Sequence, residues 1–196
     1  MGKLAELLKD EGQTEQTYTL YCDMDGVLCD FDSRFLEVLR EVGKKYYSIK
    51  GITSARDFED KYGKEEFWKF IDTTVGVRFW VGMEWTPSGA KLWNFIKKYN
   101  PTLLTSPSRN NNSRLGKRLW VKNHIAGTPV VFKYSKVKQD MATPTAILID
   151  DRQDTIERWN AAGGIGIYHP TNTHNIDKVI QQIIKVYEGE SSEEGI

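Results

Sequence analysis

The chain has 196 residues, which is enough for one full hydrophobic core, and its 39% hydrophobic and 28% charged content is that of an ordinary globular protein. Its 27 basic and 27 acidic residues give a formal net charge of zero, so overall charge gives no reason to expect duplex DNA as a partner, although a local basic groove stays open. No run of eighteen apolar residues occurs, and the first residues are too polar for a secretory signal. We therefore expect a cytoplasmic protein that does not bind a membrane.

The first predicted strand is Thr17–Cys22, a short stretch rich in Thr, Tyr and Leu. Much later in the chain, a helix is predicted to begin at Ser88 and to end before Pro101, because apolar residues recur between them at helical spacing. The second predicted strand, Thr102–Leu104, follows directly. A polar stretch then leads into a helix that is predicted to end near His124.

Three more strands and two helices are predicted in the C-terminal part of the chain. Pro129–Phe132 is a short strand, and Ala146–Ile149 is a continuous apolar run, typical of a strand that is buried on both faces of a parallel sheet. A helix and the strand Ile165–Tyr168 follow. Apolar residues at helical spacing predict a last helix that ends near Tyr187.

This alternation of strands and helices predicts an α/β fold with an open, mostly parallel, Rossmann-like sheet and helices on both faces. Residues 17–30 and 86–187 are expected to form this core. Residues 31–85 break the alternation, because they are rich in aromatic residues and contain no clear strand, so we expect a small helical cap inserted after the first strand. Residues 1–16 and 188–196 are expected to be flexible termini.

Polar residues stand just past the carboxyl ends of three predicted strands, where ligands bind in open α/β sheets. We expect these residues to converge although they are far apart in the sequence. They are Asp23 and Asp25 after the first strand, Thr105 and Ser106 after the second, and Asp150 and Asp151 after the fourth.

Carboxylates brought together in this way repel one another and need a cation. Oxygen ligands with room for water suit Mg²⁺, which usually binds through one or two carboxylates together with a substrate phosphate. Phosphoryl transfer depends mainly on positioning and charge neutralisation. The pattern therefore indicates a Mg²⁺-dependent reaction at a phosphate group.

Three motifs resemble those of the haloacid dehalogenase (HAD) superfamily in order and spacing. DMDGVL at residues 23–28 resembles its first motif, LLTSP at 103–107 its second, and ILIDD at 147–151 its fourth. Within the superfamily, DMDGVLCDF and the stretch RFWVGMEWTPSGA at 78–90 are similar to the 5′(3′)-deoxyribonucleotidase family. The resemblance covers roughly residues 18–170 and is weak in the cap.

The resemblance implies a role for each polar residue at the strand ends. Asp23 would be the nucleophile that forms an aspartyl-phosphate, and Asp25 would be the general acid and then the general base. Mg²⁺ would be held by Asp23, the backbone carbonyl of Asp25, and Asp150, with Asp151 in support. The phosphate would be bound by Thr105 and Ser106.

The third motif of the superfamily is a lysine that follows a short strand. Residues 130–141 contain three candidates, Lys133, Lys136 and Lys138. The short distance from the strand favours Lys136 as a phosphate-binding residue, while the other two stay open.

Aromatic residues of the cap are expected to form its own core, and some of them to line a nucleobase pocket. Bases stack on flat aromatic side chains. The resemblance places Phe79 and Trp80 where the family has base-facing residues.

The expected function is therefore a Mg²⁺-dependent phosphomonoester hydrolase whose small-molecule substrate is a deoxyribonucleoside monophosphate. Three alternatives stay open: another substrate of a HAD phosphatase (a sugar phosphate, a phosphoamino acid or a polynucleotide 3′-phosphate), transfer of the phosphoryl group to a hydroxyl other than water, and a non-catalytic nucleotide-binding module. The expectation of a homodimer rests on the resemblance alone.

Overall fold

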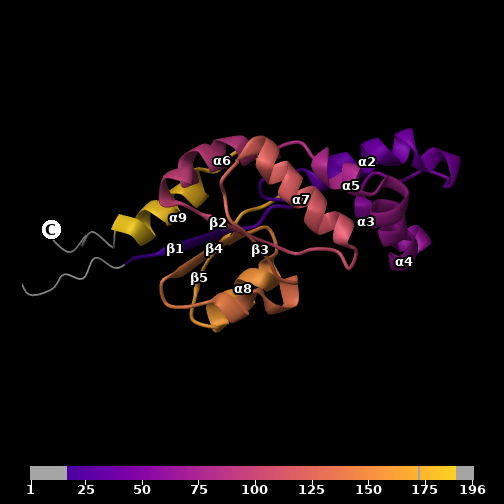
Figure 1. Cartoon of the computed structure of the whole chain (residues 1–196). Helices are drawn as coiled ribbons and strands as arrows, with labels where there is room; N and C mark the ends of the chain where they lie inside the picture. The colour runs from indigo at the N-terminus through magenta and orange to yellow at the C-terminus, as the bar shows by residue number, and fades with distance from the viewer. Residues whose placement is uncertain (1–16, 172, 189–196) are drawn as a thin grey trace, which may run out of the picture.

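The structure, a computed structural model, describes residues 17–171 and 173–188 (Figure 1). Its centre is an open sheet of five strands, all parallel, in the order β3-β2-β1-β4-β5, so the predicted α/β fold is confirmed. The strands are β1 (Thr19–Cys22), β2 (Thr102–Thr105), β3 (Val130–Phe132), β4 (Ala146–Asp150) and β5 (Ile165–Tyr168). Of the predicted flexible termini, 1–16 and 188–196, all but Glu188 lie outside the described residues, and Glu188 is the last residue of a helix.

Helices cover both faces of the sheet, as predicted (Figure 1). In the view of Figure 1, α6, α7 and α9 lie above the sheet and α8 lies below it. Their bounds, with those of two 3₁₀ turns, are α6 (Gly89–Ile96), η3 (Lys97–Tyr99), α7 (Asn111–His124), η4 (Ser135–Met141), α8 (Gln153–Ala161) and α9 (Asp177–Glu188).

Strand β4 shows why the sheet needs two helical layers. All five of its residues are buried. Ile147 and Ile149 belong to the larger core cluster with residues of α6, α7 and α9, whereas Leu148 packs with Trp159 of α8. Because side chains alternate along a strand, the four consecutive apolar residues of β4 must be covered on both faces of the sheet.

Between β1 and α6 the chain forms helical elements that lie together at one end of the molecule, at the right of Figure 1. They are α2 (Phe31–Glu41), η1 (Gly43–Lys45), α3 (Ala55–Tyr62), α4 (Lys64–Lys69), the π-helical turn η2 (Phe70–Val75) and α5 (Val77–Val81). We call residues 31–85 the cap segment. That it is a separate domain stays a prediction.

The cap segment is held together by aromatic packing and by capped helices. The ring of Phe35 lies 5.3 Å from that of Phe58 and 5.2 Å from that of Phe67, in the edge-on and tilted arrangements that aromatic rings prefer. The Asp30 carboxylate accepts a hydrogen bond from the Ser33 backbone N–H and so begins α2.

Helix α5 of the cap segment packs closely on α7 at Gly116. A Cβ atom added to Gly116 would lie 2.4 Å from the Trp80 Cβ and 3.0 Å from the Val77 carbonyl oxygen. We expect Gly116→Ala to lower the free energy of unfolding by about 1–3 kcal/mol, because the two helices must move apart. Thermal or urea unfolding measures the change, and Asn123→Ala at an exposed position of the same helix is the control. Equal stability of the two variants would contradict this close packing.

Within residues 17–171 and 173–188, none of the helices combines the length and the apolar character that crossing a membrane requires.

Candidate active site

Two aspartates meet at the carboxyl end of the sheet because β1 and β4 are neighbouring parallel strands. Asp23 directly follows β1, and Asp150 is the last residue of β4. The Asp23 backbone N–H donates to the Ile149 carbonyl oxygen at 2.9 Å, which continues the pairing of the two strands. β1 lies between β2 and β4, at the point where the strand order reverses, and ligands bind at such points in open α/β sheets.

The turn after β1 brings Asp151 against the same site. Gly26 has a φ of 79°, and a Cβ atom placed on it would lie 2.2 Å from Asp151 Oδ2. The glycine is required both for the left-handed backbone and for this close approach. The Thr171 hydroxyl, past the end of β5, donates to Asp151 Oδ2 at 2.8 Å and orients that carboxylate.

Asp23, Asp150 and Asp151 together form a carboxylate cluster, with one oxygen atom of each within 4.8 Å of the others. Burial raises the pKa of Asp150 to about 6 and that of Asp151 to about 7, and the Asp23 carboxylate adds to both rises. Three carboxylates that repel one another, two buried and one half-buried, are a suitable donor set for a hard divalent cation.

A buried lysine offsets part of this repulsion. Lys138 Nζ lies 2.8 Å from Asp23 Oδ2 and 2.7 Å from Asp150 Oδ2, and its side chain is only 1% exposed. Although burial favours the neutral amine, the two carboxylates raise the pKa of Lys138 above its ordinary value. Lys138 therefore remains charged.

The lysine preferred from the sequence does not lie in this cluster. Lys136 is exposed on η4, and Lys133 pairs at 3.7 Å with the exposed Asp140. The distance from β3 favoured Lys136, but Lys138, two residues later, is the lysine that turns inward. The reason is a kink at Val137 in the 3₁₀ turn η4. Among the three candidates, the geometry favours Lys138.

A second buried lysine, which the sequence analysis did not select, holds Asp25. Lys117 Nζ lies 2.7 Å from Asp25 Oδ2, 2.7 Å from Thr105 Oγ1 and 2.9 Å from the Ser106 carbonyl oxygen. Its side chain is fully buried. A signal was available, since Lys117 stands on the apolar face of its predicted helix, next to Gly116 and three residues before the buried Trp120.

Asp25 is held apart from the carboxylate cluster by this lysine. Burial raises the pKa of Asp25, and the Lys117 ammonium offsets part of the rise. Oδ2 is paired with Lys117, while Oδ1 makes no hydrogen bond within the described part of the chain. The structure therefore brings the four aspartates to one edge of the sheet, with Lys138 between Asp23 and Asp150 and with Asp25 on Lys117.

The predicted phosphate-binding residues Thr105 and Ser106 lie at the same edge. Thr105 is the last residue of β2 and is fully buried, and Ser106 is half-buried in the following loop. The loop leads to Asn110, whose side chain accepts a hydrogen bond from the Asn112 backbone N–H and begins α7. The N–H groups at the start of this helix favour an anion nearby.

Phe79 and Trp80 are both buried within the cap segment. Phe79 packs on Phe31, with ring centroids 5.1 Å apart, and belongs to the interior of the cap segment. The Trp80 ring lies 5.2 Å from Lys117 Nζ and so borders the carboxyl edge of the sheet. Of the two residues, only Trp80 is in direct contact with the groups described above.

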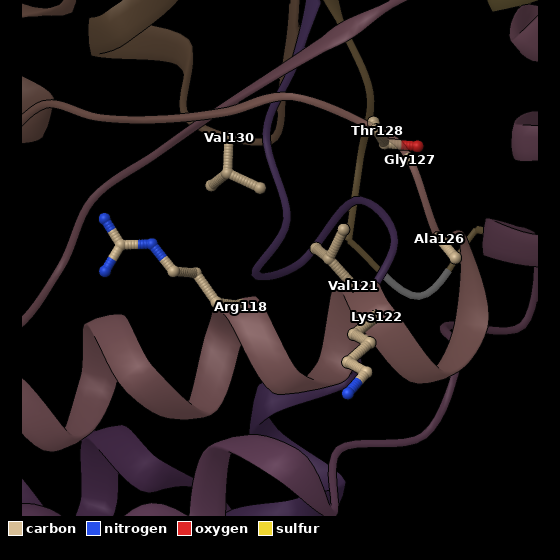
Figure 2. Close-up of a pocket in the computed structure, with 7 residues that line it drawn as sticks. All are labelled: Arg118, Val121, Lys122, Ala126, Gly127, Thr128 and Val130. Carbon is tan, nitrogen blue, oxygen red and sulfur yellow. The ribbon is translucent and has the colours of Figure 1, made fainter.

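A shallow pocket of about 310 Å³ lies away from these residues, between the C-terminal half of α7 and β3 (Figure 2). Arg118 and Lys122 line it from α7, and Val130 lines it from β3. None of the predicted site residues lines this pocket.

Comparison with known proteins supports the motif assignments. A family model described as 5′ nucleotidase, deoxy (Pyrimidine), cytosolic type C protein matches residues 17–183.

A HAD-superfamily hydrolase of subfamily IA, variant 1, from Geobacter sulfurreducens PCA is 13% identical with a TM-score of 0.51, and the match covers 89% of this chain and 98% of that one. A hydrolase from Streptococcus pneumoniae TIGR4 is 18% identical with a TM-score of 0.48, over 86% of this chain and 99% of that one. No curated protein matches the chain. At 13% identity the Geobacter structure shows a shared fold alone, and the family model confirms the resemblance seen in the motifs.

Proposed function

Since the chain belongs to the family of 5′ nucleotidase, deoxy (Pyrimidine), cytosolic type C proteins, within the HAD superfamily, it is a phosphatase, and we propose that it hydrolyses deoxyribonucleoside monophosphates through an aspartyl-phosphate on Asp23. The proposal rests on one observation: two aspartates of the site are each paired with a different buried lysine. Asp23 is paired with Lys138, and Asp25 with Lys117. Two carboxyl groups in different surroundings can take different roles.

In the first step, a carboxylate oxygen of Asp23 attacks the phosphorus atom in line and forms a new P–O bond, while the ester oxygen leaves with its bonding electrons. Asp25 donates a proton to that oxygen. In the second step, Asp25 accepts a proton from a water molecule, which attacks the phosphorus and releases Asp23 and phosphate. The raised pKa of Asp25 supports this role, because a carboxyl group that is to donate a proton near neutral pH needs a raised pKa.

The two lysines and Thr105 position these groups and neutralise charge. Lys117 donates to Asp25 and to Thr105, and so holds the acid beside the residue proposed to bind phosphate. Lys138 lies between Asp23 and Asp150, where it offsets negative charge when a phosphate dianion enters. Ser106 is proposed to contact the phosphate from the loop after β2.

The carboxylate cluster fits Mg²⁺, because it offers oxygen ligands alone. Asp23, Asp150, Asp151 and the backbone carbonyl of Asp25 would hold the ion. When bound, it would neutralise charge on the phosphoryl oxygens. The family description includes the word cytosolic, which supports a cytoplasmic location, and a homodimer stays a prediction.

We expect phosphate release from dTMP, dUMP and dGMP with Mg²⁺, and a loss of about 10²-fold or more when EDTA removes the metal. The panel adds UMP, 3′-dTMP, phosphoserine and a sugar phosphate, and initial rates of phosphate release are compared. If only the sugar phosphate is hydrolysed, the protein is still a phosphatase but the nucleotidase proposal is contradicted. Full activity in EDTA would contradict the proposed Mg²⁺ requirement.

A second substrate class is favoured by one surface feature. Arg118 and Lys122 stand on the exposed side of α7, beside the pocket of Figure 2, and Arg114 lies one turn before Arg118 on the same helix. Such a basic row suits a polynucleotide backbone. An oligonucleotide with a 3′-phosphate therefore belongs in the panel, and its hydrolysis with salt-sensitive KM would favour this class.

A further inference from the structure

The positive charge of this chain is concentrated in one part of it. Residues 85–139 contain eleven basic residues and no acidic one, so the zero net charge of the whole chain conceals a strong separation of charge. This segment forms α6, β2, α7, β3 and the first part of η4, and it includes the two strands at one edge of the sheet. A region in which every charged residue is basic attracts anions over a wide surface.

Three of these cations form a row along α7. Arg114, Arg118 and Lys122 follow one another at intervals of four residues, so they lie on one side of the helix, about 6 Å apart along its axis. Arg118 and Lys122 are exposed, and Arg114 is half-buried. None of the three forms a salt bridge with any residue that the structure describes. We call these three residues the basic row.

The last residue of β3 holds the two arginines of the basic row in place. The guanidinium carbon of Arg118 lies 5.0 Å from the centre of the Phe132 ring, and that of Arg114 lies 6.0 Å from the same centre. A guanidinium over an aromatic ring keeps its charge while its side chain is ordered. Because the two cations are ordered before a ligand arrives, less conformational entropy is lost on binding.

The basic row borders the pocket of Figure 2 at the C-terminal half of α7. Arg118 and Lys122 line this pocket together with the apolar side chains of Val121, Ala126 and Val130. Its volume of about 310 Å³ lies at the lower end of the range of small-molecule sites. Cations beside an apolar lining suit a ligand that carries phosphates and a flat ring.

The length of the basic row distinguishes between ligands of this kind. A single phosphate needs cations that converge on one point, whereas the row extends over about 12 Å along the helix and so matches a linear polyanion. In a duplex the bases are stacked inside, so only a single strand can place a base in the pocket. A run of acidic amino acids would match the charges but offers no flat ring for the apolar lining.

We propose that the basic row and the pocket beside it bind a single-stranded polynucleotide, with successive phosphates on Arg114, Arg118 and Lys122 and a base in the pocket. The inference goes beyond the proposed function, because the strand is bound along its length whether or not it ends in a phosphate monoester. Binding therefore needs none of the aspartates at the carboxyl edge of the sheet.

The experiment measures the fluorescence anisotropy of labelled strands of about 16 nucleotides, the upper site size of one binding domain, on the full chain. One strand is DNA and one is RNA of the same mixed sequence, and both end in a 3′-hydroxyl. We expect a Kd of about 10⁻⁴ to 10⁻⁶ M for at least one of them. The logarithm of the binding constant should fall with the logarithm of salt concentration with a slope of about −2, since each of three neutralised phosphates contributes about −0.7. If neither strand binds, or if the slope is near zero, the inference is overturned.

Arg118→Gln/Lys122→Gln is expected to weaken binding by about 10-fold or more and to reduce the slope to about −0.7, the value for one remaining phosphate contact. The matched control is Arg40→Gln/Lys44→Gln, which removes the same charge from two exposed positions, also four residues apart, in α2 and η1. The control should bind as the wild type does, and thermal unfolding checks that both variants are folded. An equal loss in the two variants would mean that only net charge matters, and would contradict the basic row.

Competition identifies the class of ligand and the place where it binds. A duplex of the same sequence and a polyglutamate of equal charge are expected to displace the strand at least about 10-fold less effectively than unlabelled strand does, because neither offers an unstacked base. Equal displacement by either would overturn the inference, and so would displacement by dTMP with Mg²⁺, which would place the strand at the carboxyl edge. Asp23→Asn should bind the strand as the wild type does, so a failure of the proposed function would leave this result unchanged.

Discussion

Asp23→Asn is expected to lower kcat for phosphate release by about 10⁴-fold or more, because an amide cannot act as the nucleophile that the proposed mechanism requires. The substitution keeps the shape of the site. The Asn oxygen can still accept the hydrogen bond that the Met24 backbone N–H donates to Asp23 Oδ1 at 2.7 Å, and Lys138 keeps its partner Asp150. The loss of rate should therefore occur in a folded protein.

Initial rates with dTMP and p-nitrophenyl phosphate measure this effect, and circular dichroism with thermal unfolding checks the fold. Asp140→Asn is the control, because Asp140 is an exposed carboxylate on η4 that pairs with Lys133 at 3.7 Å. The control should retain the wild-type rate within about twofold, as expected of an exposed, weakly paired charge. An Asp23→Asn protein that keeps more than a tenth of the wild-type kcat would contradict Asp23 as the nucleophile.

Lys117→Met is expected to lower kcat by about 10²- to 10³-fold, which is the usual contribution of a positioned general acid. Lys117 is proposed to act through Asp25, so we call it a positioning residue. Its Nζ contacts Asp25, Thr105 and the Ser106 carbonyl oxygen, and without it Asp25 loses its orienting partner. The free energy of unfolding is expected to fall by about 3 kcal/mol, the order of magnitude for breaking a buried pair.

A pH profile separates positioning from a purely structural role of Lys117. The ammonium lowers the pKa of Asp25, so its removal raises that pKa further above the ordinary value. A higher pKa keeps the Asp25 carboxyl protonated to higher pH, so the alkaline limb of the kcat/KM profile should shift to higher pH. Lys122→Met, on the exposed side of the same helix, should change neither the rate nor the profile. A loss of activity in Lys117→Met with an unmoved profile would contradict the positioning role.

The strands and the four aspartates could be predicted from the sequence because their signals are local. A short apolar run such as Ala146–Ile149 forms a strand in any parallel sheet, and an acidic residue directly after it must stand at the carboxyl edge. The positions of Asp23, Asp25 and Asp150 in space follow from strand ends and parallel pairing alone. Motif order then connected them to one superfamily.

The lysines could not be placed by the same reasoning. Lys136 and Lys138 differ by two positions in a short loop, and which one turns inward depends on the kink of η4 and on the charges of Asp23 and Asp150, which come from other strands. Lys117 is bound by residues 92 and 12 positions away in the chain.

The cap segment also combines features that the sequence predicted with features that only the structure shows. Its aromatic content predicted helices with a core of their own. Phe79 and Trp80 both pack on Phe31, but only Trp80 also lies beside Lys117. The sequence by itself therefore determined the parallel sheet, its carboxyl edge and the aspartates on it, because strand propensity and strand-end position are properties of neighbouring residues. Only the tertiary structure decided which cations and which cap residues meet those aspartates, because burial and pairing depend on segments that are brought together by folding.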